Sequence, residues 1–122
     1  MTKYGNRKVK RDGMVFDSVR EYQRWRELKL LEKVGKISDL QRQVKYELIP
    51  RQYSKTELTK AGNPRVEETS VRYIADFTYY DLEKNEFVVE DVKGYTKGVA
   101  YNLFTIKRKL MLYINGIRIK EV

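Results

Sequence analysis

The sequence has no cysteine and no histidine among its 122 residues. The absence of cysteine excludes disulfides, thiolate metal sites and cysteine nucleophiles. The absence of histidine excludes a Ser-His-Asp triad, zinc held by histidine, and nucleases in which a histidine base activates water. Any chemistry must therefore depend on carboxylates, lysine, tyrosine or a hard metal ion.

Long apolar runs are also absent. The longest runs span only a few residues, against roughly 18 for a membrane span, and the charged start of the chain lacks the apolar segment of a signal peptide. We therefore expect a soluble, cytoplasmic protein with no membrane partner. Hydrophobic residues make up 41% of the chain, which is enough for the core of one domain.

Positive charge is in clear excess. Lysine and arginine number 26 against 17 acidic residues, which gives a net charge of +9. Such a balance favours a polyanionic partner, and nucleic acid is favoured over a membrane because no segment shows a basic amphipathic membrane-surface pattern. The alternative is that the basic excess only keeps the protein soluble.

The apolar spacing predicts one α/β (α+β) domain at residues 14–122, with a mixed central sheet flanked by helices. Residues 1–13 are read as a flexible basic arm, and residues 51–70 as a long polar loop or an excursion from the sheet. Val99, Leu103, Ile106, Leu110 and Ile114 share one face of the second helix. The expected elements are a helix at 17–35, strands at 37–50, 71–81 and 86–93, a helix at 97–115 and a strand at 117–122.

Two aspartates lie inside the most strand-like segment. Alternation along a strand places Asp91 and Lys93 on one face, and the partner strand can bring Asp76 opposite or diagonal to Asp91. Charges in a half-buried strand are costly unless they are neutralised, and Mg²⁺ or Mn²⁺ favours such oxygen ligands. We therefore predict a metal site formed by Asp76, Asp91 and the backbone carbonyl of Val92.

Lys93 beside that metal would orient a water or stabilise the charge of a phosphorane. The alternative is an ordinary salt bridge of Lys93 with Asp91 or Asp76 on a solvated sheet face. Glu90 points to the opposite face, where surface or dimer contacts are expected.

The segments "YIADF" and "VVEDVKG" resemble the signature of the PD-(D/E)XK nuclease superfamily. The similarity covers about residues 14–49 and 71–115, and the expected order helix, three strands, helix, strand is that of the restriction-endonuclease-like core. Ala75 stands where the signature has proline, and Asp91 stands where many members have glutamate. Neither change removes a ligand type.

The first helix extends this resemblance to small phage-encoded proteins described as Holliday-junction-resolvase-like or restriction-endonuclease-like. The resemblance implies that Glu21 completes the acidic cluster, and that Gln43, Tyr46 and Leu48 form a Q-x-x-Y-x-L-like strand. Glu21 has an alternative reading, because Ser18 and Glu21 also have the spacing of a helix capping box.

The function implied is a Mg²⁺-dependent endonuclease for DNA, selective for branched structures such as Holliday junctions, in phage recombination, replication or packaging within the host cytoplasm. One site per chain predicts a homodimer, since two strands must be cut. The alternatives are a non-catalytic nucleic-acid-binding accessory protein and, less favoured, a ribonuclease-H-type resolvase. The predicted contacts to DNA are Lys8, Lys10, Arg11, Gln43, Lys97, Lys107 and Arg108.

Overall fold

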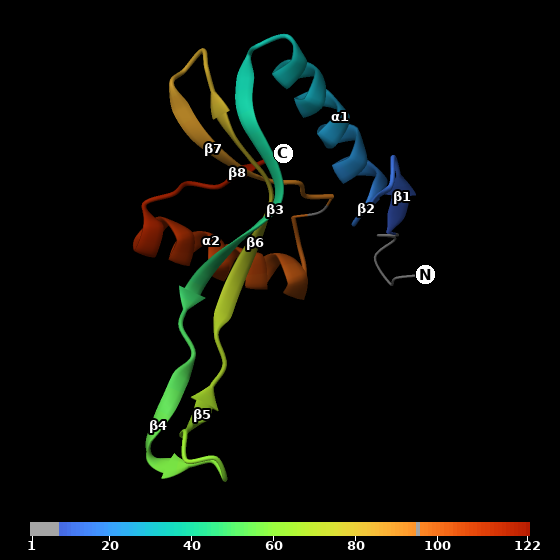
Figure 1. The fold of residues 1–122 in the computed structure, drawn as a ribbon. Helices are drawn as coiled ribbons and strands as arrows, with labels where there is room; N and C mark the ends of the chain where they lie inside the picture. The colour runs from blue at the N-terminus through green and yellow to red at the C-terminus, as the bar shows by residue number, and fades with distance from the viewer. Residues whose placement is uncertain (1–7, 95) are drawn as a thin grey trace.

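A four-stranded mixed sheet organises the chain in the computed structural model, which describes residues 8–94 and 96–122 (Figure 1). The strand order is β3–β6–β7–β8, in which β8 runs parallel to β7 and the other neighbours are antiparallel. The fold is α+β, and the predicted order helix, three strands, helix, strand is found with two further hairpins added. The sheet strands are β3 (Ile37–Ile49), β6 (Val71–Asp81), β7 (Glu86–Asp91) and β8 (Lys120–Glu121).

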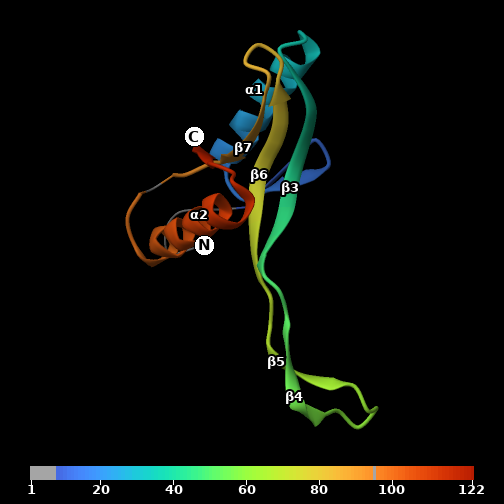
Figure 2. The same cartoon turned by 90° about the vertical axis from the view of Figure 1, so that its left-hand side faces the viewer.

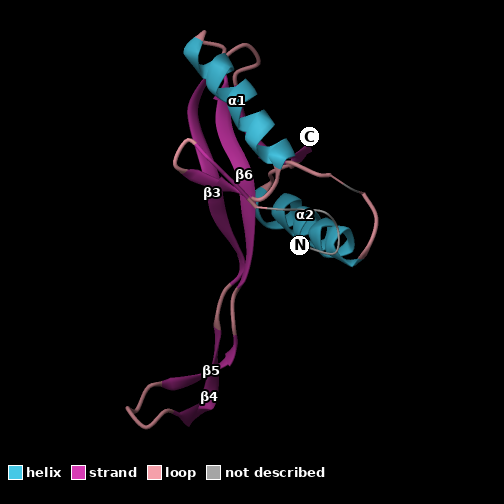
Figure 3. Ribbon diagram, turned by 90° about the vertical axis from the view of Figure 1, so that its right-hand side faces the viewer, coloured by secondary structure: helices cyan, strands magenta, loops and turns pink. Residues whose placement is uncertain are grey.

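Two helices, α1 (Val19–Lys33) and α2 (Val99–Asn115), pack on the same side of the long β3–β6 pair (Figures 2 and 3). Alternate residues of β6 explain this arrangement, because side chains two positions apart share a face. Tyr73 and Ala75 belong to a buried cluster with α2, whereas Phe77 and Tyr79 belong to a second cluster with α1. The middle of β6 therefore lies between the two helices.

Helix α1 begins and ends where the sequence indicates. Ser18 is its N-cap, and the Ser18 Oγ accepts a hydrogen bond from the backbone N–H of Glu21 at 3.1 Å. Gly35 follows the C-cap with a φ of +81°, a left-handed conformation that glycine adopts without a Cβ clash. These caps fix the position of the first turn, in which Glu21 lies.

Helix α2 uses a different face than the one its sequence suggests. Its buried residues are Phe104 and Met111, which lie seven positions apart on one side of the helix. The predicted apolar face, represented by Val99, Leu103 and Ile106, is exposed. Phe104 packs between Tyr73 and Tyr101, so the larger aromatic residue directs the helix onto the sheet.

Two segments expected to be irregular form hairpins. Residues 1–7 of the predicted arm lie outside the described residues, but β1 (Val9–Arg11) pairs with β2 (Met14–Phe16). The predicted loop at 51–70 contains β4 (Gln52–Leu58) and β5 (Pro64–Glu68), which extend β3 and β6 away from the sheet (Figure 1). Nearly all residues of this β4–β5 hairpin are exposed, and a strand without a buried face leaves no alternating apolar pattern to detect. The predictions of a flexible arm and of a loop are therefore corrected for these residues, whereas the alternative of an excursion from the sheet describes β4 and β5.

Within the described part of the chain, neither helix is long and apolar enough to cross a membrane.

The packing predicts a sharp contrast between the sheet and the β4–β5 hairpin. Phe77 is fully buried and stacks on Trp25 with ring centroids 6.1 Å apart, so Phe77→Ala should lower the free energy of unfolding by about 3–5 kcal/mol. Tyr53 is half exposed on the hairpin, and Tyr53→Ala should cost less than about 1 kcal/mol. Equal costs in urea denaturation would contradict the assignment of the core to the sheet.

Candidate metal centre

A pocket of about 290 Å³ opens where the first turn of α1, the middle of β6 and the end of β7 meet. Glu21, Asp76, Asp91 and Lys93 all line it, and Val92 lies between the last two. Residues that are up to 72 positions apart in the sequence are thus brought to one place. The structure places together the four side chains that the sequence singles out for chemistry.

The β6–β7 register positions the two aspartates. Phe77 pairs with Glu90, so the next position along each strand brings Asp76 opposite Asp91. The strand pairing ends there, and the backbone N–H of Val92 instead donates to Asp76 Oδ2 at 2.7 Å. This hydrogen bond holds the Asp76 carboxylate beside the end of β7.

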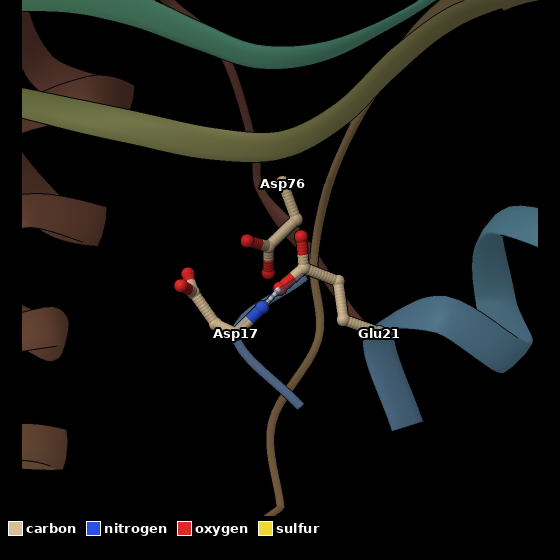
Figure 4. Close-up of side chains that lie close together, drawn as sticks. All are labelled: Asp17, Glu21 and Asp76. Atoms are coloured by element: carbon tan, nitrogen blue, oxygen red, sulfur yellow. Dashed lines mark hydrogen bonds between the residues drawn. The ribbon is translucent and has the colours of Figure 1, made fainter. Parts of the chain in front are cut away.

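Three carboxyl groups converge in the pocket. One oxygen each from Asp17, Glu21 and Asp76 lies within 4.8 Å of the other two (Figure 4). The sequence predicted Asp91 as a member of this group, but the third carboxyl is that of Asp17. Asp91 lies nearby, at the end of β7. The spacing of Asp17 and Glu21, one helical turn apart around the N-cap, is the signal that could have revealed Asp17.

The electrostatics show that these acids repel one another in a partly dry pocket. Burial, followed by the charge of Asp91, raises the pKa of Asp76 to about 8, although the Val92 N–H acts in the opposite direction. Burial, followed by the charge of Asp17, also raises the pKa of Glu21. Hard oxygen donors at this spacing suit a divalent cation such as Mg²⁺, which would neutralise them.

Asp91 and Lys93 form a close ion pair. Lys93 Nζ lies 2.8 Å from Asp91 Oδ1, as the alternation along the strand predicts, and the Tyr73 hydroxyl donates to Asp91 Oδ2 at 2.6 Å. Asp91 is buried, so the alternative of a salt bridge on a solvated face is half right: the pair exists, but in the interior. Lys93 Nζ also lies 3.8 Å from the ring centroid of Phe104, which fixes the ammonium at the edge of the pocket.

Glu21 makes both kinds of contact that the sequence left open. Its carboxylate accepts from the backbone N–H of Asp17 at 3.2 Å, which is a capping interaction, and it faces Asp76 at the same time. Gln43 Nε2 donates to Glu21 Oε1 at 3.0 Å. Gln43 has a φ of +53°. It lies opposite Asp76 on the neighbouring strand, because the residues on either side of it, Arg42 and Val44, pair with Phe77 and Ala75. Gln43 therefore orients Glu21 within the protein.

Glu90 corrects one prediction, because it is fully buried rather than at the surface. Arg24 Nε and Nη2 bind its two carboxylate oxygens at 2.8 and 2.6 Å, and the Tyr79 hydroxyl also donates to it. Glu90 and Asp91 point to opposite faces of β7, and Glu90 lies on the face that α1 covers. Its ion pair with Arg24 therefore attaches α1 to the sheet. A face assignment from alternation alone cannot show that a helix covers the other face.

The predicted DNA contacts are spread over the surface. Lys8 Nζ binds Asp17 Oδ1 at 2.9 Å. Lys107 lines a second pocket of about 270 Å³, to which Arg72 also belongs. This second pocket shares Asp91 and Lys93 with the first. Lys8 and Lys107 therefore lie beside the acids. The other predicted contacts are in three places: Lys10 and Arg11 in β1, Lys97 exposed before α2, and Arg108 paired with Glu121.

The family model described as "Protein of unknown function (DUF1064)" matches residues 1–118. No curated protein and no solved structure gives a significant match.

The raised pKa of Asp76 predicts a pH-dependent stability without divalent ions. The pKa of the Asp76 carboxyl is about 8 in the folded chain and near 4 in the unfolded chain. The stability that the protonated carboxyl contributes is therefore fully present below about pH 4 and is lost as the pH rises through 8. Asp76→Asn cannot ionise, and in EDTA its unfolding free energy should exceed that of the wild type by on the order of a few kcal/mol at pH 8 and by little at pH 5. Glu83→Gln, which changes an exposed acid, should leave the pH profile unchanged. A constant difference across this range would contradict the assignment.

The Arg24–Glu90 pair generates a second prediction. Arg24→Ala leaves a buried carboxylate without its cation and should lower the free energy of unfolding by about 3–5 kcal/mol. Arg65→Ala removes an exposed partner of Glu57 and should have a small effect. Similar denaturation midpoints for the two variants would show that Glu90 is not held in this way.

Proposed function

The chain belongs to the DUF1064 family, and we propose that it is a Mg²⁺-dependent endonuclease of the PD-(D/E)XK type on a restriction-endonuclease-like core. The observation that supports this most is the pocket in which Glu21 from α1, Asp76 from β6 and Asp91 from β7 meet Lys93. Ion pairs that serve only the fold do not need additional carboxylates whose pKa values are raised by burial and, to a lesser extent, by mutual repulsion. A site for a cation does.

Asp76, Asp91, Glu21 and the Val92 carbonyl would hold the ion, with Asp17 as a further carboxylate. Bound Mg²⁺ supplies Lewis-acid polarisation of a phosphoryl oxygen and a lowered pKa for water. The Val92 N–H and the Tyr73 hydroxyl each hold one aspartate in place, so the ligand oxygens are positioned in advance. Gln43 does the same for Glu21.

We assign the role of the catalytic ammonium to Lys93. Its Nζ is fixed between Asp91 and the Phe104 ring at the edge of the pocket, next to the acids and open to a substrate. An ammonium there stabilises the negative charge that develops on a phosphorane, or orients the attacking water. This role requires no histidine, in agreement with the composition.

DNA is the proposed substrate because the net charge of +9 favours a polyanion. Lys8, Lys107 and Arg72 lie beside the acidic pocket, where they would offset its repulsion of phosphate. Selectivity for branched DNA, and a role in phage recombination, replication or packaging, come from the sequence resemblance. A homodimer would supply the second site needed to cut both strands.

A non-catalytic nucleic-acid-binding protein is the second candidate. The observation in its favour is that Asp17 and Asp91 already have lysine partners, Lys8 and Lys93. In that case the acids stabilise the fold and the basic surface does the binding.

Cleavage of supercoiled, linear and four-way-junction DNA, with Mg²⁺ or with EDTA, separates the two functions. Asp76→Asn, Asp91→Asn and Lys93→Met should each lower the Mg²⁺-dependent rate by about 100-fold or more, because the first two remove a charged metal ligand and the third removes the ammonium beside the reacting phosphate. Lys29→Met, at an exposed ion pair with Glu32, should retain full activity. DNA binding with no cleavage by the wild type under any of these conditions would establish the second candidate.

A further inference from the structure

Two pockets of opposite charge adjoin each other at the end of β7. The acidic pocket is lined by four carboxylates and two basic side chains. The second pocket is lined by three basic side chains and a single carboxylate, that of Asp91. We call it the β6–α2 pocket, because most of its lining residues belong to those two elements. The pockets have Asp91 and Lys93 in common, so a site suited to a cation shares a wall with a site suited to an anion.

We propose that the β6–α2 pocket binds a phosphate of the DNA backbone next to the phosphate at the acidic pocket, with Arg72 and Lys107 as its ligands. This inference rests on the proposed function, because it adds a second phosphate of the same substrate. Arg72 and Lys107 would hold the strand over the metal site and would take no part in the bond-breaking step.

The end of β7 explains why a pocket forms here. Asp91 lies opposite Asp76, so among the described residues the part of β6 that contains Arg72 has no strand on that side. Helix α2 packs beside this part of β6, where Phe104 contacts Tyr73. The lining residues that come from α2 are Ala100, Leu103, Phe104 and Lys107. An arginine of the sheet and a lysine of the helix thereby line one cavity.

The basic groups of the β6–α2 pocket are available to an anion. Lys93 Nζ lies 2.8 Å from Asp91 Oδ1, which neutralises the one carboxylate of the pocket. In the part of the chain that the structure describes, neither Arg72 nor Lys107 forms an ion pair, although Glu47 lies opposite Arg72 on β3. A cleft lined by an excess of one charge attracts the opposite charge.

A continuous strand fits the two pockets better than a free phosphate does. Ile74 and Leu103, which are 44% and 54% exposed, line the pocket together with the cations and offer an apolar contact to the sugar. Consecutive phosphates of one strand rise by about 3.4 Å along a duplex, so pockets with a common wall suit neighbouring phosphates. One strand can therefore occupy both pockets at once.

Equilibrium binding of a fluorescent duplex DNA in EDTA, over a range of salt concentrations, tests the pocket without any cleavage. Arg72→Met and Lys107→Met should each lower the slope of log affinity against log salt by about 1, because each removes one phosphate contact. Lys109→Met removes the same charge from an exposed site on α2 outside the pocket, and it should change the slope less. An unchanged slope in either pocket variant, or equal effects of Lys107→Met and Lys109→Met, would overturn the proposal.

Methylphosphonate linkages, each of which removes the charge of one phosphate, locate the contact along the strand. With wild-type protein and Mg²⁺, one such linkage adjacent to the scissile phosphate should slow cleavage by about tenfold. Arg72→Met and Lys107→Met should be insensitive to that linkage, since they have already lost the contact. Equal sensitivity of the wild type and both variants would contradict the assignment.

The two experiments separate this inference from the proposed function. DNA binding with the expected slopes but without cleavage would refute the nuclease and support the pocket, whereas cleavage with unchanged slopes would do the reverse. Saturable binding of inorganic phosphate at micromolar concentration, measured by calorimetry, would assign the pocket to a small phosphate compound and would overturn the proposal.

Discussion

The antiparallel register of β6 and β7 is the constraint on which the site depends. It brings Asp76 opposite Asp91, and the end of the pairing frees the Val92 N–H to bind Asp76. A shift of one residue would turn every side chain of β7 to the other face and would exchange Asp91 with Glu90. The buried Arg24–Glu90 pair makes that exchange costly, because Arg24 on α1 would lose its partner.

This arrangement has a cost in stability that the rest of the domain must offset. Three acids meet in a pocket where Asp76 favours the neutral form at neutral pH, so the folded chain holds a proton that a cation would replace. The two buried clusters on either side of the middle of β6, one with each helix, flank the site. The repulsive groups are therefore held by elements that are stable for other reasons.

The sequence predicts the elements that have a buried face and misses those that lack one. Helical spacing and strand alternation locate α1, α2 and the sheet, whereas the exposed β4–β5 hairpin has no apolar period. The motif spacing identifies Asp76, Asp91 and Lys93, and the family resemblance adds Glu21. Asp17, however, reaches the pocket through the loop before α1, and Glu90 is buried by a helix distant in sequence. Alternation tells which residues share a face, and only the tertiary packing tells what covers it.

Helix α2 supports the proposed site from one side. Phe104 on its buried face contacts the Lys93 ammonium and Tyr73, and Tyr73 in turn holds Asp91. Leu103, the residue before Phe104, is exposed and lines the pocket that contains Asp91 and Lys93. The same helix therefore closes the buried cluster over β6 and fixes the lysine at the site, so the packing of the core and the geometry of the acidic pocket depend on each other.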